Sequence, residues 1–184
     1  APAVDWQVQL AHRKHDAKLV VVDMRRIKLA GQSETFLQYR PGSEAQLAGA
    51  LAKLIVAKNQ ADTSYLTQYV GNQADLLAYL NGIDVAAACA ASGVDPDLLE
   101  EAAGYLGAAK SVAVIFGRAI MQAVNAEDAV AALANLALVS GALQGDCGGI
   151  FPVAEQGNAS GLIETGICPE FLPGFQENAA GGAD

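Results

Sequence analysis

The sequence predicts an α/β fold, a mostly parallel sheet covered by helices on both faces, and three observations support this prediction. Two apolar runs, residues 17–23 and 111–117, show no polar alternation, which is typical of strands buried on both faces of a parallel sheet. Segments with helical spacing precede, separate and follow these runs. The 184 residues, 52% of them hydrophobic, suffice for one domain with a substantial core.

The first half of the chain predicts helix, strand, strand and helix in that order. Residues 2–15 have helical spacing, and a short second strand with a turn is expected within 34–42. The next helix is expected over 44–59, with Ser43 and Gln46 as its capping box. Its core-facing stripe would consist of Leu47, Ala50, Leu51, Leu54 and Ile55.

The second half repeats the alternation after a less regular stretch. Residues 61–94 read as polar-rich helical pieces, a helical excursion from the sheet. Asp95 as N-cap and Pro96 at the first helical position begin a helix that leads to the run at 111–117. A further helix begins after Asn125 as N-cap and ends near Gly141. The resulting expectation is a three-layer, Rossmann-like arrangement.

One domain over residues 1–176 is expected, with 177–184 as a flexible tail. The chain starts at Ala1 without a methionine, and no strand precedes its first helix. We therefore expect a fragment of a longer protein that lacks the first strand of the sheet.

Composition argues against several classes of function. A net charge of −9, from 20 acidic and 11 basic residues, argues against a nucleic-acid-binding surface. The longest apolar run, 129–143, is interrupted by polar residues and predicts a buried helix, so no direct membrane insertion is expected. The odd number of cysteines and the absence of a C-x-x-C pair fit a reducing compartment: Cys89, Cys147 and Cys168.

No catalytic group or metal site is expected in this segment. Neither a Walker sequence nor a nucleophile elbow occurs, and His12 and His15 lack further ligands at a suitable spacing. Asp23 ends a predicted strand and is similar to the ribose-binding acid of dinucleotide folds, although no glycine motif precedes it.

Five segments, taken in order, resemble the central domain of the molybdopterin oxidoreductases. This family includes formate dehydrogenases and the iron–sulfur subunit of NADH-quinone oxidoreductase, the respiratory complex I. The resemblance covers almost the whole chain. The segments are "AKLVVVDMRR", "RPGSEAQLAGALAKLIV", "GVDPDLLEEAAGYLGAAKSVAVIFGRAIMQ", "ANLALVSGAL" and "FPVAEQGNASGLIETGICPEFLPGFQ".

The resemblance implies cofactor-binding positions, because this domain holds one half of a bis(molybdopterin guanine dinucleotide) cofactor in the family's cofactor-binding members. Asp23 and Arg25 match the family's D-P-R, and Gly42 and Glu44 match P-G-[ST]-[DN]. Gly117 and Gln122 match a glycine at a strand end and the glutamine after it, while the polar loop R-G-Q-N-N-x-Q-G is matched by Gln156, Asn158 and Gly161.

Departures from the family pattern favour a degenerate site. Met24 stands where the family has proline, Ala154 where it has arginine, and Ser160 where it has glutamine. Glu44 replaces a shorter acid or amide. Alanine cannot supply the guanidinium fork that holds an anion. The preferred interpretation is therefore a fragment of the iron–sulfur subunit of complex I, without a cofactor of its own.

In that interpretation the segment is a scaffold among the other subunits of the peripheral arm of a respiratory complex. Iron–sulfur clusters would lie in the missing N-terminal part of the parent chain, and the complex would be cytoplasmic and peripheral to the inner membrane. The parent would be an NADH:quinone oxidoreductase, whose catalytic residues are expected outside this segment.

Two alternatives remain. One is the molybdopterin guanine dinucleotide-binding domain of a formate dehydrogenase-like molybdenum or tungsten oxidoreductase. The other is a free-standing Rossmann-type binding module. Each matched residue also has a purely structural interpretation, in which Asp23 caps a loop, Gly42 and Gly117 serve turns, and the amides satisfy loop carbonyls.

Overall fold

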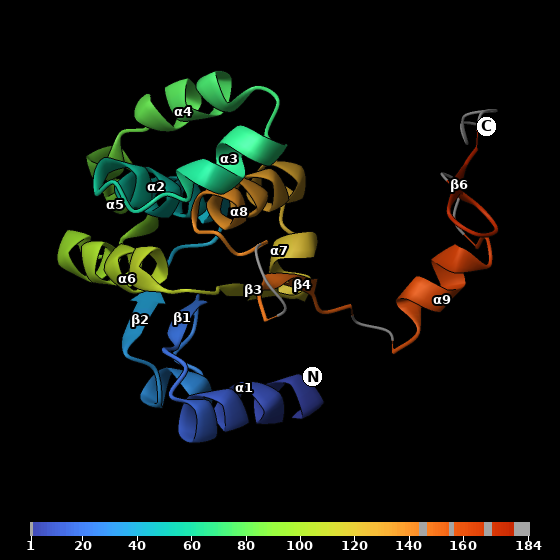
Figure 1. The fold of residues 1–184 in the computed structure, drawn as a ribbon. Coiled ribbons are helices and arrows are strands. Elements are labelled where there is room, and N and C mark those ends of the chain that lie inside the picture. Colours follow the sequence, from blue (N-terminus) through green and yellow to red (C-terminus); the bar gives the residue numbers. More distant parts are fainter. Residues whose placement is uncertain (1, 144–146, 155–156, 168–170, 179–184) are drawn as a thin grey trace. The chain divides into compact units, whose positions relative to one another are not determined.

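The computed structural model describes residues 2–143, 147–154, 157–167 and 171–178, drawn in colour in Figure 1. The chain divides into two compact units, Ala1–Phe151 and Pro152–Asp184. Each unit is treated by itself below, and the single domain expected over 1–176 stays a prediction.

The first unit alternates helices and short strands, as predicted. Its first half contains α1 (Pro2–His15), β1 (Val20–Asp23), the 3-10 helix η1 (Lys28–Gly31), β2 (Thr35–Gln38) and α2 (Glu44–Ala57). A helical stretch follows, with α3 (Thr63–Tyr69), α4 (Gln73–Asn81), α5 (Val85–Ser92) and α6 (Pro96–Ala108). The unit continues with β3 (Ala113–Phe116), α7 (Arg118–Met121), α8 (Ala126–Val139) and β4 (Gly149–Pro152).

The predicted α/β class is confirmed, although the strands are short. β1 and β2 are parallel, with Val20 opposite Thr35 and Asp23 opposite Gln38. The described strands pair as β1 with β2, β3 with β4, and β5 with β6, so they form two-stranded sheets instead of one wide sheet.

The prediction that the strands are buried on both faces is wrong for β1 and β3. Val21 is buried whereas its neighbour Val22 is 42% exposed, and Ile115 of β3 is 43% exposed. Successive strand residues point to opposite faces, and the helix layer of α2, α6 and α8 covers one of them. α1 lies beyond the other face (Figure 1) and has no buried residue, so that face stays partly open.

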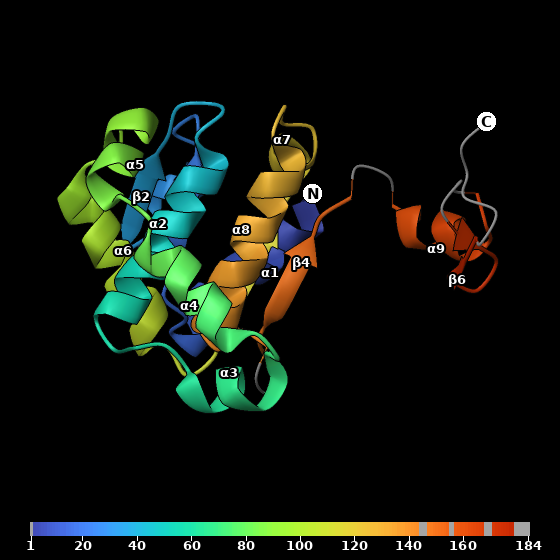
Figure 2. The same ribbon diagram turned by 90° about the horizontal axis from the view of Figure 1, so that it is seen from above.

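The core lies around α2, which packs against α8, α6 and α5 (Figure 2). The predicted apolar stripe of α2 is confirmed: four of its members are buried, and the fifth, Leu54, packs against the same cluster. Ala50 and Ala52 are fully buried, and such small side chains allow neighbouring helices to approach closely.

Helix starts are confirmed in position but only partly in mechanism. The Asp95 carboxylate accepts a hydrogen bond from the Asp97 N–H at 2.9 Å, and Pro96 occupies the first turn of α6, both as predicted. The capping box at α2 is wrong, because Ser43 has φ −105° and ψ 13° instead of the extended backbone that this cap requires. Its hydroxyl donates to the Arg40 carbonyl oxygen at 2.6 Å instead.

The stretch 61–94 is helical, as expected, and it contributes to the core. Asp62 and Asp84 accept hydrogen bonds from the backbone N–H groups of Tyr65 and Ala87, so they cap α3 and α5. Leu66 and Leu80 are fully buried in the main cluster. Among the described helices, none is by itself long and apolar enough to span a membrane; α4 and α5 meet that test only as a pair, which is bent by 65°.

A polar cluster joins α1 to β1. The Glu34 carboxylate accepts a hydrogen bond from the Leu19 N–H at 2.6 Å and lies 3.5 Å from Lys18 Nζ and 4.0 Å from His12 Nδ1. Burial raises the pKa of Glu34, but this hydrogen bond, one from its own backbone N–H and the charges of His12 and Lys18 outweigh burial, so the pKa is lowered from 4.5.

We expect this cluster to stabilise the fold in a pH-dependent way. Because the folded-state pKa of Glu34 is depressed, its contribution is complete above pH 4.5 and is lost as the pH falls through the folded-state value. Urea unfolding of the wild type and of Glu34→Gln should therefore differ at about pH 6 and converge at about pH 3. The exposed Glu127→Gln variant is the control, and a wild-type advantage that persisted at the lower pH would contradict the assignment.

The second unit contains the short helix α9 (Ala159–Glu164) and the antiparallel strands β5 (Phe171–Leu172) and β6 (Gln176–Glu177). The Gly174 N–H donates to the Glu164 carbonyl oxygen at 2.7 Å, and the rings of Phe171 and Phe175 meet edge to face at 6.2 Å. These contacts connect the turn between the strands to the helix.

Candidate functional site

The carboxyl ends of β1 and β2 form one edge of the parallel sheet, where the sequence placed Asp23. Asp23 Oδ1 accepts a hydrogen bond from the Arg25 N–H at 2.8 Å, so one oxygen of this carboxylate organises its own loop. The side-chain amide of Gln38 donates to the Met24 carbonyl oxygen at 3.1 Å. The loop after β1 is thereby tied to the end of β2, while Arg25 itself is exposed.

The turn before α2 brings Gly42 and Glu44 to the same edge. Gly42 has φ +89°, a conformation that glycine adopts without strain, and its N–H donates to Glu44 Oε1 at 3.1 Å. Glu44 is 8% exposed, and its second oxygen, Oε2, is buried with no hydrogen-bond partner among the described residues. A buried acceptor of this kind costs about 1–3 kcal/mol if nothing pairs with it.

Asn125, at the start of α8, meets the same turn from a position 83 residues further along the chain. Its side chain makes no capping hydrogen bond to α8, so that half of the N-cap prediction is wrong. Instead Asn125 Nδ2 donates to the Gly42 carbonyl oxygen at 3.4 Å, and Asn125 Oδ1 is buried without a partner in the described part of the chain. The turn at Gly42 therefore has two unpaired acceptor oxygens beside it, from Glu44 and Asn125.

Tyr39 connects this turn electrostatically with Asp23. The residue is 6% exposed, and burial, followed by the negative charges of Glu44 and Asp23, raises the pKa of its phenol. Both carboxylates are therefore near one buried aromatic side chain. The structure brings Asp23, Gly42 and Glu44 together as the sequence predicted, and it adds Tyr39 and Asn125, which sequence reasoning did not assign to a site.

The remaining predicted positions in the first unit lie on α7. Gly117 and Gln122 flank this single-turn helix, which packs against α8. Gly117 has an extended backbone, so its conformation does not require glycine, and the side chain of Gln122 is exposed. In residues 2–143, no interaction joins these two positions to Glu44.

The polar loop belongs to the second unit. Asn158 immediately precedes α9, and its side chain lies against Gly161, where an added Cβ would collide with it. Gly161 thus has a local packing role. Gln156 lies outside the described residues.

Groups that could hold a metal are absent among the described histidine, cysteine and acidic side chains. Cys89 is buried, and burial with the nearby charge of Asp95 raises the pKa of its thiol, whereas Cys147 is exposed. The edge is therefore built from carboxylates, amides and backbone groups, which suit a ligand rich in hydrogen-bond donors.

Comparison with known proteins identifies oxidoreductases. No protein-family model matches the chain. It is 43% identical over 176 residues to the NADPH-Fe(3+) oxidoreductase subunit alpha of Geobacter sulfurreducens, covering 96% of this chain and 21% of that protein. It is 30% identical over 161 residues to the F420-dependent formate dehydrogenase subunit alpha of Methanocaldococcus jannaschii, covering 88% of this chain and 24% of that protein.

Two more distant relatives agree with this result. Formate dehydrogenase H of Escherichia coli is 26% identical over 164 residues, which cover 89% of this chain and 23% of the enzyme. Acetylene hydratase from Pelobacter acetylenicus shares the fold, with a TM-score of 0.70 and 20% identity over 74% of this chain and 19% of that structure. The chain thus spans about a fifth to a quarter of the length of these proteins.

Proposed function

We propose that the chain is part of a molybdopterin oxidoreductase, the family that includes formate dehydrogenases, and that the edge around Gly42 and Glu44 receives the guanine end of a molybdopterin guanine dinucleotide cofactor. The formate dehydrogenases among its relatives support the family. They favour this proposal over the complex I interpretation preferred from the sequence, since no relative named above is a subunit of that complex.

One observation carries the proposal, the pair of buried acceptor oxygens without partners beside Gly42, Glu44 Oε2 and Asn125 Oδ1. Guanine presents a ring N–H beside an exocyclic amine, so two donors point in one direction. A carboxylate accepts such paired donors well, and hydrogen bonds to charged groups are the stronger ones. These residues therefore fit the base of the cofactor, which would supply the partners that the two oxygens lack.

The remaining groups of the edge would orient the nucleotide. Gly42 leaves the backbone open, because a Cβ at this position would meet nothing within 4 Å. Arg25 is an exposed cation on the loop after β1 and would face anionic groups of the ligand. When bound in the parent enzyme, a molybdopterin cofactor supplies the metal-centred electron transfer.

Glu44→Gln tests the proposal directly. Replacing the carboxylate by an amide puts a donor where the guanine also donates, and we expect GDP binding to the purified chain to weaken about 10- to 100-fold. Isothermal titration with GDP and ADP measures the effect, and the wild type should prefer GDP. Glu101→Gln, an exposed acid on α6, is the matched control. Equal affinity for the two nucleotides, or an unchanged Glu44→Gln variant, would contradict the proposal.

A second candidate is the scaffold role in the iron–sulfur subunit of NADH-quinone oxidoreductase, with neighbouring subunits of the peripheral arm as partners, at the cytoplasmic side of the inner membrane. Ala154, in place of the family's arginine, favours it, because the anion-binding guanidinium is absent there. Molybdenum, tungsten and pterin analysis of the purified parent protein separates the candidates. Stoichiometric metal and pterin support the first, and their absence from an NADH-oxidising preparation supports the second.

In either case we propose that the chain works beside other subunits. Two of the relatives are named as alpha subunits.

A further inference from the structure

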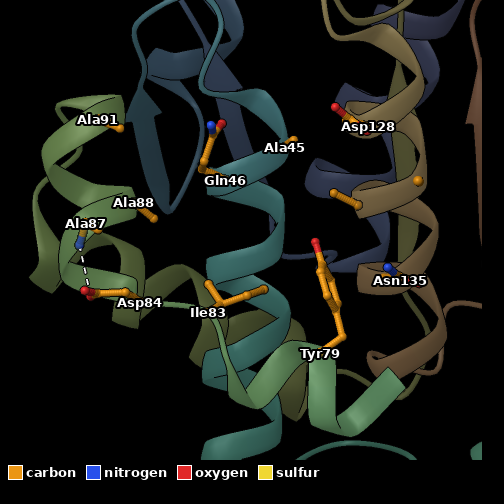
Figure 3. Close-up of a pocket in the computed structure, with 12 residues that line it drawn as sticks. Ala45, Gln46, Tyr79, Ile83, Asp84, Ala87, Ala88, Ala91, Asp128 and Asn135 are labelled. Carbon is orange, nitrogen blue, oxygen red and sulfur yellow. Dashed lines mark hydrogen bonds between the residues drawn. The ribbon is translucent and has the colours of Figure 1, made fainter. Parts of the chain in front are cut away.

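A groove runs over the helix layer, between α2 and α8 on its floor and α4 and α5 at its side (Figure 3). Its volume is about 790 Å³, and a smaller hollow of about 280 Å³ shares Tyr79 and Asn135 with it. The lining residues of the larger hollow come from four helices and are mostly alanines: Ala45, Gln46, Tyr79, Ile83, Asp84, Ala87, Ala88, Ala91, Asp128, Ala131, Ala132 and Asn135.

We propose that this groove binds an amphipathic helix of another subunit, a helix with small apolar residues along its centre and Lys or Arg along its edges. The inference rests on the proposed function only in assuming a partner subunit. The groove involves neither Glu44 Oε2 nor Asn125, so it can fail or succeed independently of the cofactor site.

The apolar floor carries the first part of the argument. The alanines at 87, 88 and 91 of α5 face those at 131 and 132 of α8 across the groove (Figure 3 labels the α5 side). Alanine methyl groups leave room for a helix axis to approach to about 8 Å, the short end of helix packing distances. Helix-in-groove recognition uses an apolar stripe of this kind.

The line of contacts along α8 fits a helical partner. Across the two hollows, α8 contributes positions separated by three or four residues, which lie on one face of a helix. They are Asp128, Ala131, Ala132, Asn135 and Leu138. Tyr79, which is 59% exposed, stands over the middle of this line in Figure 3 and is of a residue type that often anchors interfaces.

The charges around the groove select the partner. Asp84 and Asp128 line the larger hollow and Asp75 lines the smaller one, and among the described lining residues none is basic. Asp84 also caps α5, which uses one carboxylate oxygen without removing its charge. A basic helix therefore complements the groove, whereas an acidic one is repelled. The net charge of the chain, −9, acts in the same direction.

The test uses the 184-residue chain and a synthetic helical peptide of about five turns with an Ala/Leu face and Lys at both edges. A second peptide carries Glu in place of Lys. Binding is followed by fluorescence anisotropy and by the methyl NMR signals of alanines, which report the site. We expect saturable binding of the Lys peptide only, with shifts confined to the groove alanines.

Two matched pairs of variants locate the site. Asp128 and Glu127 both lie in the first turn of α8, but only Asp128 lines the groove. Asp128→Lys should weaken Lys-peptide binding at least about tenfold, and Glu127→Lys less than about twofold. Ala87→Leu should fill the groove and have the same effect, whereas Ala86→Leu, exposed on the same helix, should not.

Three results would overturn the inference. The first is no saturable binding of the Lys peptide up to about 1 mM, a concentration at which even a weak interface binds. The second is equal binding of the Glu peptide, which would remove the charge argument. The third is equal weakening by both members of either pair, or NMR shifts outside the groove. GDP binding that survives Asp128→Lys would show that loss of the peptide leaves the cofactor site intact.

Discussion

Leu99→Ala is expected to lower the free energy of unfolding by about 2–5 kcal/mol, the range for a fully buried leucine. Leu99 is 0% exposed on α6, which packs against both α2 and β2. Truncation removes burial and also leaves a cavity among three elements, which relax only partly. Urea unfolding followed by far-ultraviolet circular dichroism measures the change.

The preceding residue provides the control for this prediction. Leu98 is 40% exposed on the same helix, so Leu98→Ala makes the same chemical change with the same effect on helix propensity. We expect a loss of at most about 1 kcal/mol. Similar losses for the two variants would mean that α6 does not pack on the core as described.

Gly42→Val is expected to destabilise the fold by about 1–3 kcal/mol and to abolish GDP binding. The φ of +89° at Gly42 is strained for any residue with a Cβ and most of all for a β-branched one. Because a Cβ there meets no atom within 4 Å, the cost comes from the backbone and not from a clash. The turn must shift, and both its N–H to Glu44 and its carbonyl to Asn125 shift with it.

A second glycine gives a control of opposite sign. Gly104 lies inside α6, has no positive φ, and also has nothing within 4 Å of an added Cβ. Gly104→Ala should therefore stabilise the protein by about 0.5–1 kcal/mol and leave GDP binding unchanged. Calorimetric unfolding and nucleotide titration of both variants test the pair. A destabilised Gly104→Ala variant, or a stable Gly42→Val variant that binds GDP, would contradict this account.

Elements that depend on local pattern were predicted well. The Asp95–Pro96 helix start and the apolar stripe of α2 agree with the structure, because short-range hydrogen bonds and periodicity determine them. The capping box at Ser43 failed, since the hydroxyl satisfies the Arg40 carbonyl of a tight turn. The strands failed as doubly buried elements because an apolar run does not indicate which faces have neighbours.

The candidate site divides in the same way. Family-matched positions found Asp23, Gly42 and Glu44, since these follow strand ends and therefore meet at one edge. Asn125 was missed as a site residue, because an asparagine before a helix is usually interpreted as a local cap. Its contact with Gly42 spans 83 residues, and no local pattern encodes such a distance.

The sequence by itself determined the α/β class, the order of the helices and strands, and the strand end that carries Asp23, because these depend on periodicity, caps and turn residues within a few positions. Only the tertiary structure decided that the turn at Gly42 and the start of α8 share two unpaired acceptors among the described residues, and that four helices leave an acidic, alanine-lined groove. Those features arise from packing between distant segments, whose geometry is determined only when the whole core forms.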